Sequence, residues 1–174
     1  MAGIERIEII GTSNYLKERK QIGDDAIPDL NSLYRNILPL ADDEIITECT
    51  KDQAKSRYDY IEGIDVILTL KDKSRITLQE KVLTTDFSTV TFEERKANGD
   101  LGGWYYTTAQ LYMCAYRIDN KIARYCLIDL LKLKLASNTI DLKWHYQNNI
   151  NRAETFRYIY FKDIPNDCII SMKL

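Results

Sequence analysis

The chain has 174 residues, of which 45% are hydrophobic and 29% charged, with a formal net charge of −2 and a pI near 5.5. A chain of this length can bury a core without disulfide or metal staples, so we expect one domain over residues 1–174. The slight acidity argues against a protein that coats polyanions in bulk, although a local basic groove needs only a few Lys and Arg residues.

Several classes of protein are disfavoured at once. The N-terminus carries Glu5, Arg6 and Glu8 rather than an apolar run, and no stretch approaches the roughly 18 apolar residues of a membrane span. We do not expect a structural zinc site. We expect a cytoplasmic protein whose thiols are reduced. The four cysteines lie far apart, without the spacing of metal ligands: Cys49, Cys114, Cys126 and Cys168.

The N-terminal third reads as helical. The cluster Thr12–Asn14 offers N-caps for a helix over residues 15–20, which Gly23 is expected to end. Pro28 suits the first turn of a second helix that ends before Pro39, because apolar residues recur there at helical spacing. A third helix is predicted from residue 41 towards residue 57, since acidic residues occupy its first turn.

The remainder alternates between strands and one further helix. Aromatic and small apolar residues recur at helical spacing between Trp104 and Arg117, which predicts a helix there. Helices followed by strands, a helix and more strands indicate a mixed α/β or α+β domain in which helices flank a mixed β-sheet. Runs rich in Ile, Val, Leu and Thr predict strands at residues 63–70, 76–83, 88–93, 123–130 and 155–162.

A hairpin formed by the first two of these strands is the most informative feature. The polar residues between Lys71 and Arg75 form the break expected of its turn. In that antiparallel pairing, facing residues have numbers that sum to about 144 to 146, which brings Asp65 opposite residues 79–81. Because side chains alternate along a strand, Gln79 and Lys81 point to one face and Glu80 to the other.

These residues suit metal-assisted hydrolysis. A carboxylate and an amide oxygen, from Asp65 and Gln79, are ligands that Mg²⁺ or Mn²⁺ accepts. A neighbouring amine, from Lys81, can orient an attacking water or stabilise the charge that develops on a phosphate. The alternative is a purely structural role, in which Asp65 caps the start of a strand and Gln79 and Lys81 form a solvated strand face.

The acid on one strand and the spaced lysine on the next resemble the PD-(D/E)xK nuclease superfamily. Gln79-Glu80-Lys81 is similar to the QxK variant of modification-dependent restriction enzymes and resolvase-like members. The resemblance implies a restriction-endonuclease-like core, a Mg-dependent endonuclease acting on DNA, and metal ligation by Asp65, Gln79 and the Glu80 carbonyl. It also implies a homodimer, since cutting both strands needs two sites. Two departures are that no proline precedes Asp65 and that Gln79 replaces the second acid.

An amide in place of an acid weakens the metal site unless another carboxylate contributes. The family often takes such an acid from an earlier helix, which suggests Glu48, with Glu44, Glu18 and Asp59 as rivals. The family often places a polar residue on the helix after the core strands, near the substrate backbone, and the resemblance therefore suggests Gln110 for contact with DNA. The basic residues Lys121 and Arg124 are expected to contact phosphates.

Other functions compete with this reading. A catalytically inactive nuclease-fold protein that binds nucleic acid or protein would also explain Gln79 and the acidic pI. A small-molecule enzyme is a third alternative, and it predicts a closed pocket lined by tyrosines. Serine or cysteine hydrolase chemistry is set aside, because His145 is the only histidine and no GxSxG elbow occurs.

Overall fold

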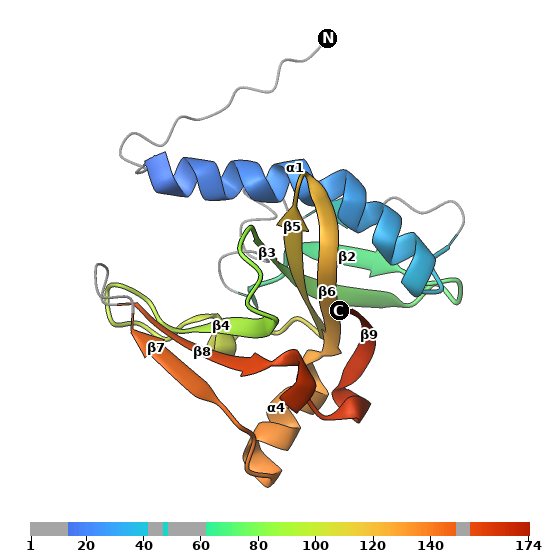
Figure 1. Cartoon of the computed structure of the whole chain (residues 1–174). Coiled ribbons are helices and arrows are strands. Elements are labelled where there is room, and N and C mark those ends of the chain that lie inside the picture. Colours follow the sequence, from blue (N-terminus) through green and yellow to red (C-terminus); the bar gives the residue numbers. More distant parts are fainter. Residues whose placement is uncertain (1–13, 42–46, 49–61, 149–153) are drawn as a thin grey trace.

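The computed structural model describes residues 14–41, 47–48, 62–148 and 154–174 (Figure 1). Its fold is of the mixed α/β class predicted from the sequence. The larger sheet of the described residues has six strands, in the order β1-β2-β3-β5-β6-β9, and only β3 and β5 pair in parallel. Its strands are β1 (Thr47–Glu48), β2 (Val66–Thr69), β3 (Arg75–Leu83), β5 (Leu111–Ile118), β6 (Lys121–Asp129) and β9 (Ile169–Lys173).

A smaller antiparallel sheet accompanies the larger one, in the order β4-β8-β7. It consists of β4 (Thr89–Arg95), β8 (Thr155–Tyr160) and β7 (His145–Asn148), and it extends to one side of the larger sheet in Figure 1. Among the described residues are the helices α1 (Asn14–Ile37), the single-turn α3 (Gly103–Tyr106) and α4 (Leu130–Thr139), with 3₁₀ turns η1 (Phe161–Asp163) and η2 (Asn166–Cys168).

Two clusters of buried side chains lie on the two faces of the larger sheet. On one face, α1 packs its Ala26, Leu30 and Tyr34 against strand residues such as Leu78 and Met113. The other cluster joins the larger sheet to the small sheet, α3 and α4. The second face is therefore covered by the small sheet together with the short helices α3 and α4.

Helix α1 corrects the predicted N-terminal helices. We expected one helix to end at Gly23 and another to start at Pro28, whereas a single helix runs from Asn14 to Ile37 through both residues. The buried residues of α1 recur every four positions around Pro28, and packing of this stripe on the sheet outweighs the hydrogen bond that proline lacks. Figure 1 shows the helix changing direction part way along its length.

Two other predicted helices are also corrected. The helix expected over residues 104–117 is only one turn long, and Leu111–Ile118 form the central strand β5. Six consecutive residues of β5 are buried, so both faces are apolar, and such a run cannot be told from a helix by periodicity alone. The helix expected over residues 41–57 is wrong at Thr47–Glu48, which form β1, and most of that range lies outside the described residues.

The predicted hairpin is present, and its register lies within the range predicted from the sequence. Val66 pairs with Leu78 and Thr69 with Arg75, so the facing residue numbers sum to 144. The predicted strands over 88–93, 123–130 and 155–162 correspond to β4, β6 and β8.

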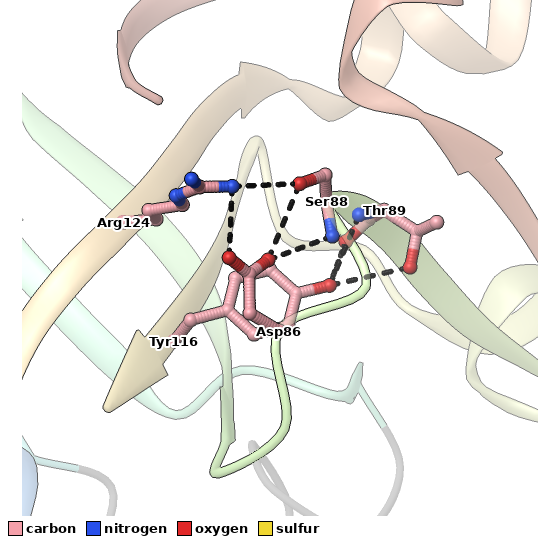
Figure 2. A network of polar contacts seen from close by, with 5 residues as sticks. All are labelled: Asp86, Ser88, Thr89, Tyr116 and Arg124. Atoms are coloured by element: carbon pink, nitrogen blue, oxygen red, sulfur yellow. Dashed lines mark hydrogen bonds and ion pairs between the residues drawn. The ribbon is translucent and has the colours of Figure 1, made fainter. Parts of the chain in front are cut away.

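A polar network holds the point where the chain passes from β3 into the small sheet (Figure 2). The Tyr116 hydroxyl donates to the Thr89 carbonyl at 2.7 Å and accepts from the Thr89 amide at 3.0 Å. The Arg124 guanidinium forms an ion pair with Asp86 at 2.8 Å and donates to the Ser88 hydroxyl at 3.0 Å. These contacts attach the start of β4 to strands β5 and β6.

Candidate functional site

Asp65 precedes β2 and lies beside the QxK segment of β3. Its backbone amide donates to the Leu78 carbonyl at 2.9 Å, and its carboxylate Oδ2 accepts the Glu80 amide at 2.7 Å. Burial raises the pKa of Tyr112, and the charge of Asp65 adds to this effect. Since Tyr112 pairs with Gln79 across β3 and β5, the Asp65 carboxylate and Gln79 share one region of the sheet.

The alternation along β3 separates the middle residue of the motif from its neighbours. Glu80 points towards α1, where its Oε1 accepts a hydrogen bond from the Tyr34 hydroxyl at 2.6 Å. Lys81 points to the opposite face, and its Nζ lies 5.2 Å from the ring centre of Phe156 on β8. Gln79 shares the face of Lys81 and lies near Gly103 at the start of α3.

Gly63 shapes the entry into β2. Its φ is +59°, and a Cβ there would lie 2.9 Å from the Thr107 Cβ. The Thr107 hydroxyl donates to the Gly63 carbonyl at 2.9 Å, so the loop after α3 is attached to the segment just before Asp65. A side chain at Gly63 would displace this loop and with it the start of β2.

The sequence argument missed Glu93 on β4. Glu93 pairs with Phe156 and therefore shares the face of the small sheet whose Phe156 ring meets Lys81. A Cβ at Gly102 would lie 2.7 Å from the Glu93 Cγ, and a Cβ at the adjacent Gly103 would lie 3.6 Å from the Gln79 Nε2. Both side chains thus reach the same pair of glycines. Only the packing of the two sheets brings Glu93 here, and no local spacing signals it.

Tyr34 supports the motif from the α1 side. Burial raises its pKa well above the usual value, and the nearby charges of Glu80 and Asp65 raise it further. The hydroxyl is therefore protonated at neutral pH and can donate to Glu80 at all ordinary pH values.

Replacing Tyr34 by phenylalanine is expected to lower the free energy of unfolding by about 1.5–3 kcal/mol, because a half-buried carboxylate loses a charge-assisted hydrogen bond. Urea denaturation measures this change. The control is Tyr125→Phe, which removes a neutral contact to the Ser171 hydroxyl and should cost about 1 kcal/mol. Equal losses in the two variants would contradict a special role for the Tyr34–Glu80 contact.

The donor set of this region fits a magnesium ion only with many waters. Asp65 and Glu93 are carboxylates, and Gln79 and the Glu80 carbonyl are neutral oxygen donors, which are ligands of the class Mg²⁺ prefers. Within the described ranges, no group of three or more His, Cys, Asp or Glu residues is arranged to hold a metal. The chemistry of the donors is suitable, and their total charge is low.

The acids predicted from earlier helices fall in different places. Glu48 lies in strand β1 and not in a helix. Its backbone pairs with Val66, the residue that follows Asp65. Glu18 on α1 lines a cavity of about 250 Å³ at the Leu83 end of β3, away from Asp65. Glu44 and Asp59 lie outside the described residues.

The residues predicted to contact DNA do not gather around Asp65. Gln110 is not on a helix but precedes β5, and its Oε1 accepts the Thr77 amide at 3.0 Å. Lys121 is exposed at the first position of β6, directly after the turn that follows β5. Arg124 is engaged with Asp86 and Ser88 in the network of Figure 2.

Other chemistries receive little support from the described residues. Burial raises the pKa of the Cys114 thiol to about 11 and that of Cys126 to about 12, so neither is a thiolate at neutral pH. His145 stacks on Tyr158 with ring centres 5.1 Å apart. Two cavities among the described residues, of about 250 and 210 Å³, have no tyrosine in their linings, unlike the pocket that a small-molecule enzyme predicts.

Comparison with known families, curated proteins and solved structures gives no match for this chain. Across the part of the chain that is described, no helix has both the length and the apolar character needed to cross a bilayer. Function must therefore be inferred from the placement of Asp65, Gln79 and Lys81 and from the groups around them.

Proposed function

We propose that this protein is a metal-dependent nuclease that hydrolyses phosphodiester bonds in DNA, with Mg²⁺ or Mn²⁺ as its cofactor. The supporting observation is the hairpin of β2 and β3, in which Asp65 accepts the Glu80 amide while Gln79 and Lys81 project together towards the small sheet. This is the arrangement that the PD-(D/E)xK resemblance implies for an acid, a second ligand and a lysine.

Each residue has a distinct role in this proposal. Asp65, Gln79 and the Glu80 carbonyl would hold the ion, and Glu93 would supply the carboxylate that the QxK motif lacks. The ion, when bound, contributes Lewis acidity and a more acidic water. The Lys81 ammonium donates a hydrogen bond to a phosphate oxygen and stabilises the negative charge that grows there in the transition state. Cutting both strands of a duplex would require two copies of the chain, so we propose a homodimer for that reaction.

A second candidate is a nuclease-fold module that binds nucleic acid without cutting it. The neutral Gln79 favours this function, because it leaves the hairpin with one carboxylate on the face where the metal is proposed. The two candidates differ in whether a divalent ion binds at all.

Thermal unfolding with and without metal separates these candidates. If the ion binds with a Kd near 1 mM, 10 mM Mg²⁺ or Mn²⁺ should stabilise the protein by about 1.4 kcal/mol, or about 3–5 °C in Tm. Asp65→Asn should abolish the shift and Glu93→Gln should reduce it, whereas Asp72→Asn, at the exposed hairpin turn, should leave it unchanged. A shift that persists in Asp65→Asn would exclude this metal site.

A further inference from the structure

One face of the small sheet carries a row of aromatic rings, formed by Phe156, Tyr158 and Tyr160 on β8 and His145 on β7. Residues that alternate along β8 share a face, and His145 pairs with Tyr158, so all four rings lie on the same side of the sheet. His145 is exposed and the three β8 rings are half-buried. We call these four residues the aromatic row.

Three rings of the row, those of His145, Tyr158 and Tyr160, contact one another. His145 stacks on Tyr158 with an interplanar angle of 17°, and Tyr158 meets Tyr160 edge-on with ring centres 5.9 Å apart. His145 also meets Tyr160 edge-on at 5.2 Å. This mutual packing restricts the rings of His145, Tyr158 and Tyr160, so they present π-faces and edges that lose little conformational freedom when a planar ligand binds.

A lysine stands at each end of the row. The Lys81 Nζ lies 5.2 Å from the Phe156 ring centre, and the Lys162 Nζ lies 5.7 Å from that of Tyr160. The row therefore begins at the proposed nuclease site and ends at a second cation. Glu93, the carboxylate on the same face, lies beside Phe156 at the end where the metal is proposed.

The opposite face of the small sheet has a different character. Tyr146, next to His145 in sequence, points to the side of Arg157, whose guanidinium lies 5.6 Å from the Tyr146 ring centre. Arg157 and Ile159 on that side are buried. Tyr146 is itself exposed, so what distinguishes the aromatic-row face is a row of rings with a lysine at each end.

We propose that the aromatic row binds an unpaired nucleic-acid strand, whose bases stack on the rings and whose phosphates meet Lys81 and Lys162. Aromatic platforms flanked by cations bind single strands without sequence preference, because every base has a π-face and every linkage a charge. A duplex presents only its stacked edges and backbone to such a surface. This inference rests on the proposed function for the identity of the substrate, and it narrows that substrate to a single-stranded or locally unpaired form.

The charge of the row predicts a weak dependence on salt. Two lysines would neutralise about two phosphates, so the logarithm of the binding constant should fall with the logarithm of salt concentration with a slope of about −1.4. A protein that gained its affinity mainly from phosphate contacts would have a much steeper slope. The shallow salt dependence is expected because stacking, and not phosphate contact, is the main source of affinity in this proposal.

Fluorescence anisotropy of labelled oligonucleotides tests the proposal, with the full chain and a chelator present so that no cleavage occurs. We expect dT or rU oligonucleotides to bind at least tenfold more tightly than a duplex of the same length. Comparing the affinities for dT and rU shows whether the preferred strand is DNA or RNA. Tyr158→Ala and His145→Ala should each weaken binding about tenfold, whereas Tyr158→Phe should stay within twofold of wild type. Tyr146→Ala is the matched control on the opposite face and should leave affinity unchanged, with circular dichroism confirming that each variant is folded.

Three binding results would overturn the inference: a duplex bound as tightly as a single strand, equal losses in His145→Ala and Tyr146→Ala, or no binding of the dT and rU oligonucleotides. Asp65→Asn separates this failure from failure of the proposed function. If wild type and Asp65→Asn bind single strands equally but neither cuts with metal, the row is supported and the nuclease is refuted. If the wild type cuts single strands and the row variants cut them equally well, the row is refuted alone.

Discussion

Replacing Lys81 by alanine is expected to lower the rate of metal-dependent DNA cleavage by about a thousandfold. Removing one preorganised donor that stabilises charge in the transition state costs about a hundredfold to a thousandfold, and the lysine also assists the attacking water. Its Nζ is held near the Phe156 ring, so it is already positioned before substrate binds. Initial rates of plasmid relaxation, measured with saturating Mg²⁺ or Mn²⁺, report the change.

A second lysine of the same hairpin provides the control for this experiment. Lys71 is exposed at the turn between β2 and β3, so Lys71→Ala removes the same charge at the far end of the hairpin and should cut at the wild-type rate. Thermal unfolding of both variants shows whether they remain folded. Cleavage by Lys81→Ala at the wild-type rate would remove this residue from the mechanism.

Replacing Arg157 by alanine is expected to lower the free energy of unfolding by about 3–5 kcal/mol, because an ion pair with little solvent exposure loses one partner. Arg157 is 8% exposed, and its guanidinium contacts both carboxylate oxygens of Glu94, one of them at 2.7 Å. Four rings surround the guanidinium within 6 Å of its central carbon: Trp104, Tyr105, Trp144 and Tyr146. Urea denaturation monitored by tryptophan fluorescence measures the loss.

The neighbouring strand offers a matched control for this change. Arg95→Ala, at the exposed end of β4, removes a contact to the Gly99 carbonyl and should cost about 0.5 kcal/mol or less. A loss below 1 kcal/mol in Arg157→Ala would show that the ring cluster and Glu94 do not depend on the guanidinium.

The Arg157–Glu94 ion pair makes the free energy of unfolding depend on pH. Hydrogen bonds from Arg157 lower the pKa of Glu94 below its usual value. A depressed folded-state pKa stabilises the fold at pH values above the unfolded pKa, and this stabilisation is lost as the pH falls through the folded pKa. Glu94→Gln should therefore flatten the acid limb of the stability curve, measured as the urea midpoint between about pH 6 and pH 3.

The hairpin could be predicted because its determinants are local. Two runs rich in Ile, Val, Leu and Thr, separated by a polar turn, predict the antiparallel pairing of β2 and β3, and the period of two along a strand predicts which side chains share a face. The positions of Asp65 and Lys81 follow from that register. The same reasoning failed for β5, where buried neighbours on both faces gave an apolar run without a strand period.

Contacts between distant segments account for what the sequence could not predict. Glu93 and the aromatic row reach the candidate site only because the small sheet packs on β5, through contacts such as the Tyr112 hydroxyl donating to the Thr91 carbonyl at 2.8 Å. Lys121 and Arg124 were predicted to contact DNA because of their charge, and Arg124 is instead paired with Asp86 in the network that attaches β4. Charge alone does not reveal which cations already have structural partners.

The most direct test of the proposed function is cleavage of a labelled single-stranded oligonucleotide and a supercoiled plasmid by the wild-type chain, with Mg²⁺, Mn²⁺ or chelator, beside Asp65→Asn. We predict cleavage that requires the metal and is lost in Asp65→Asn, with the single strand cut more readily. Cleavage that persists in chelator or in Asp65→Asn, or no cleavage of either substrate with either metal, would contradict the account.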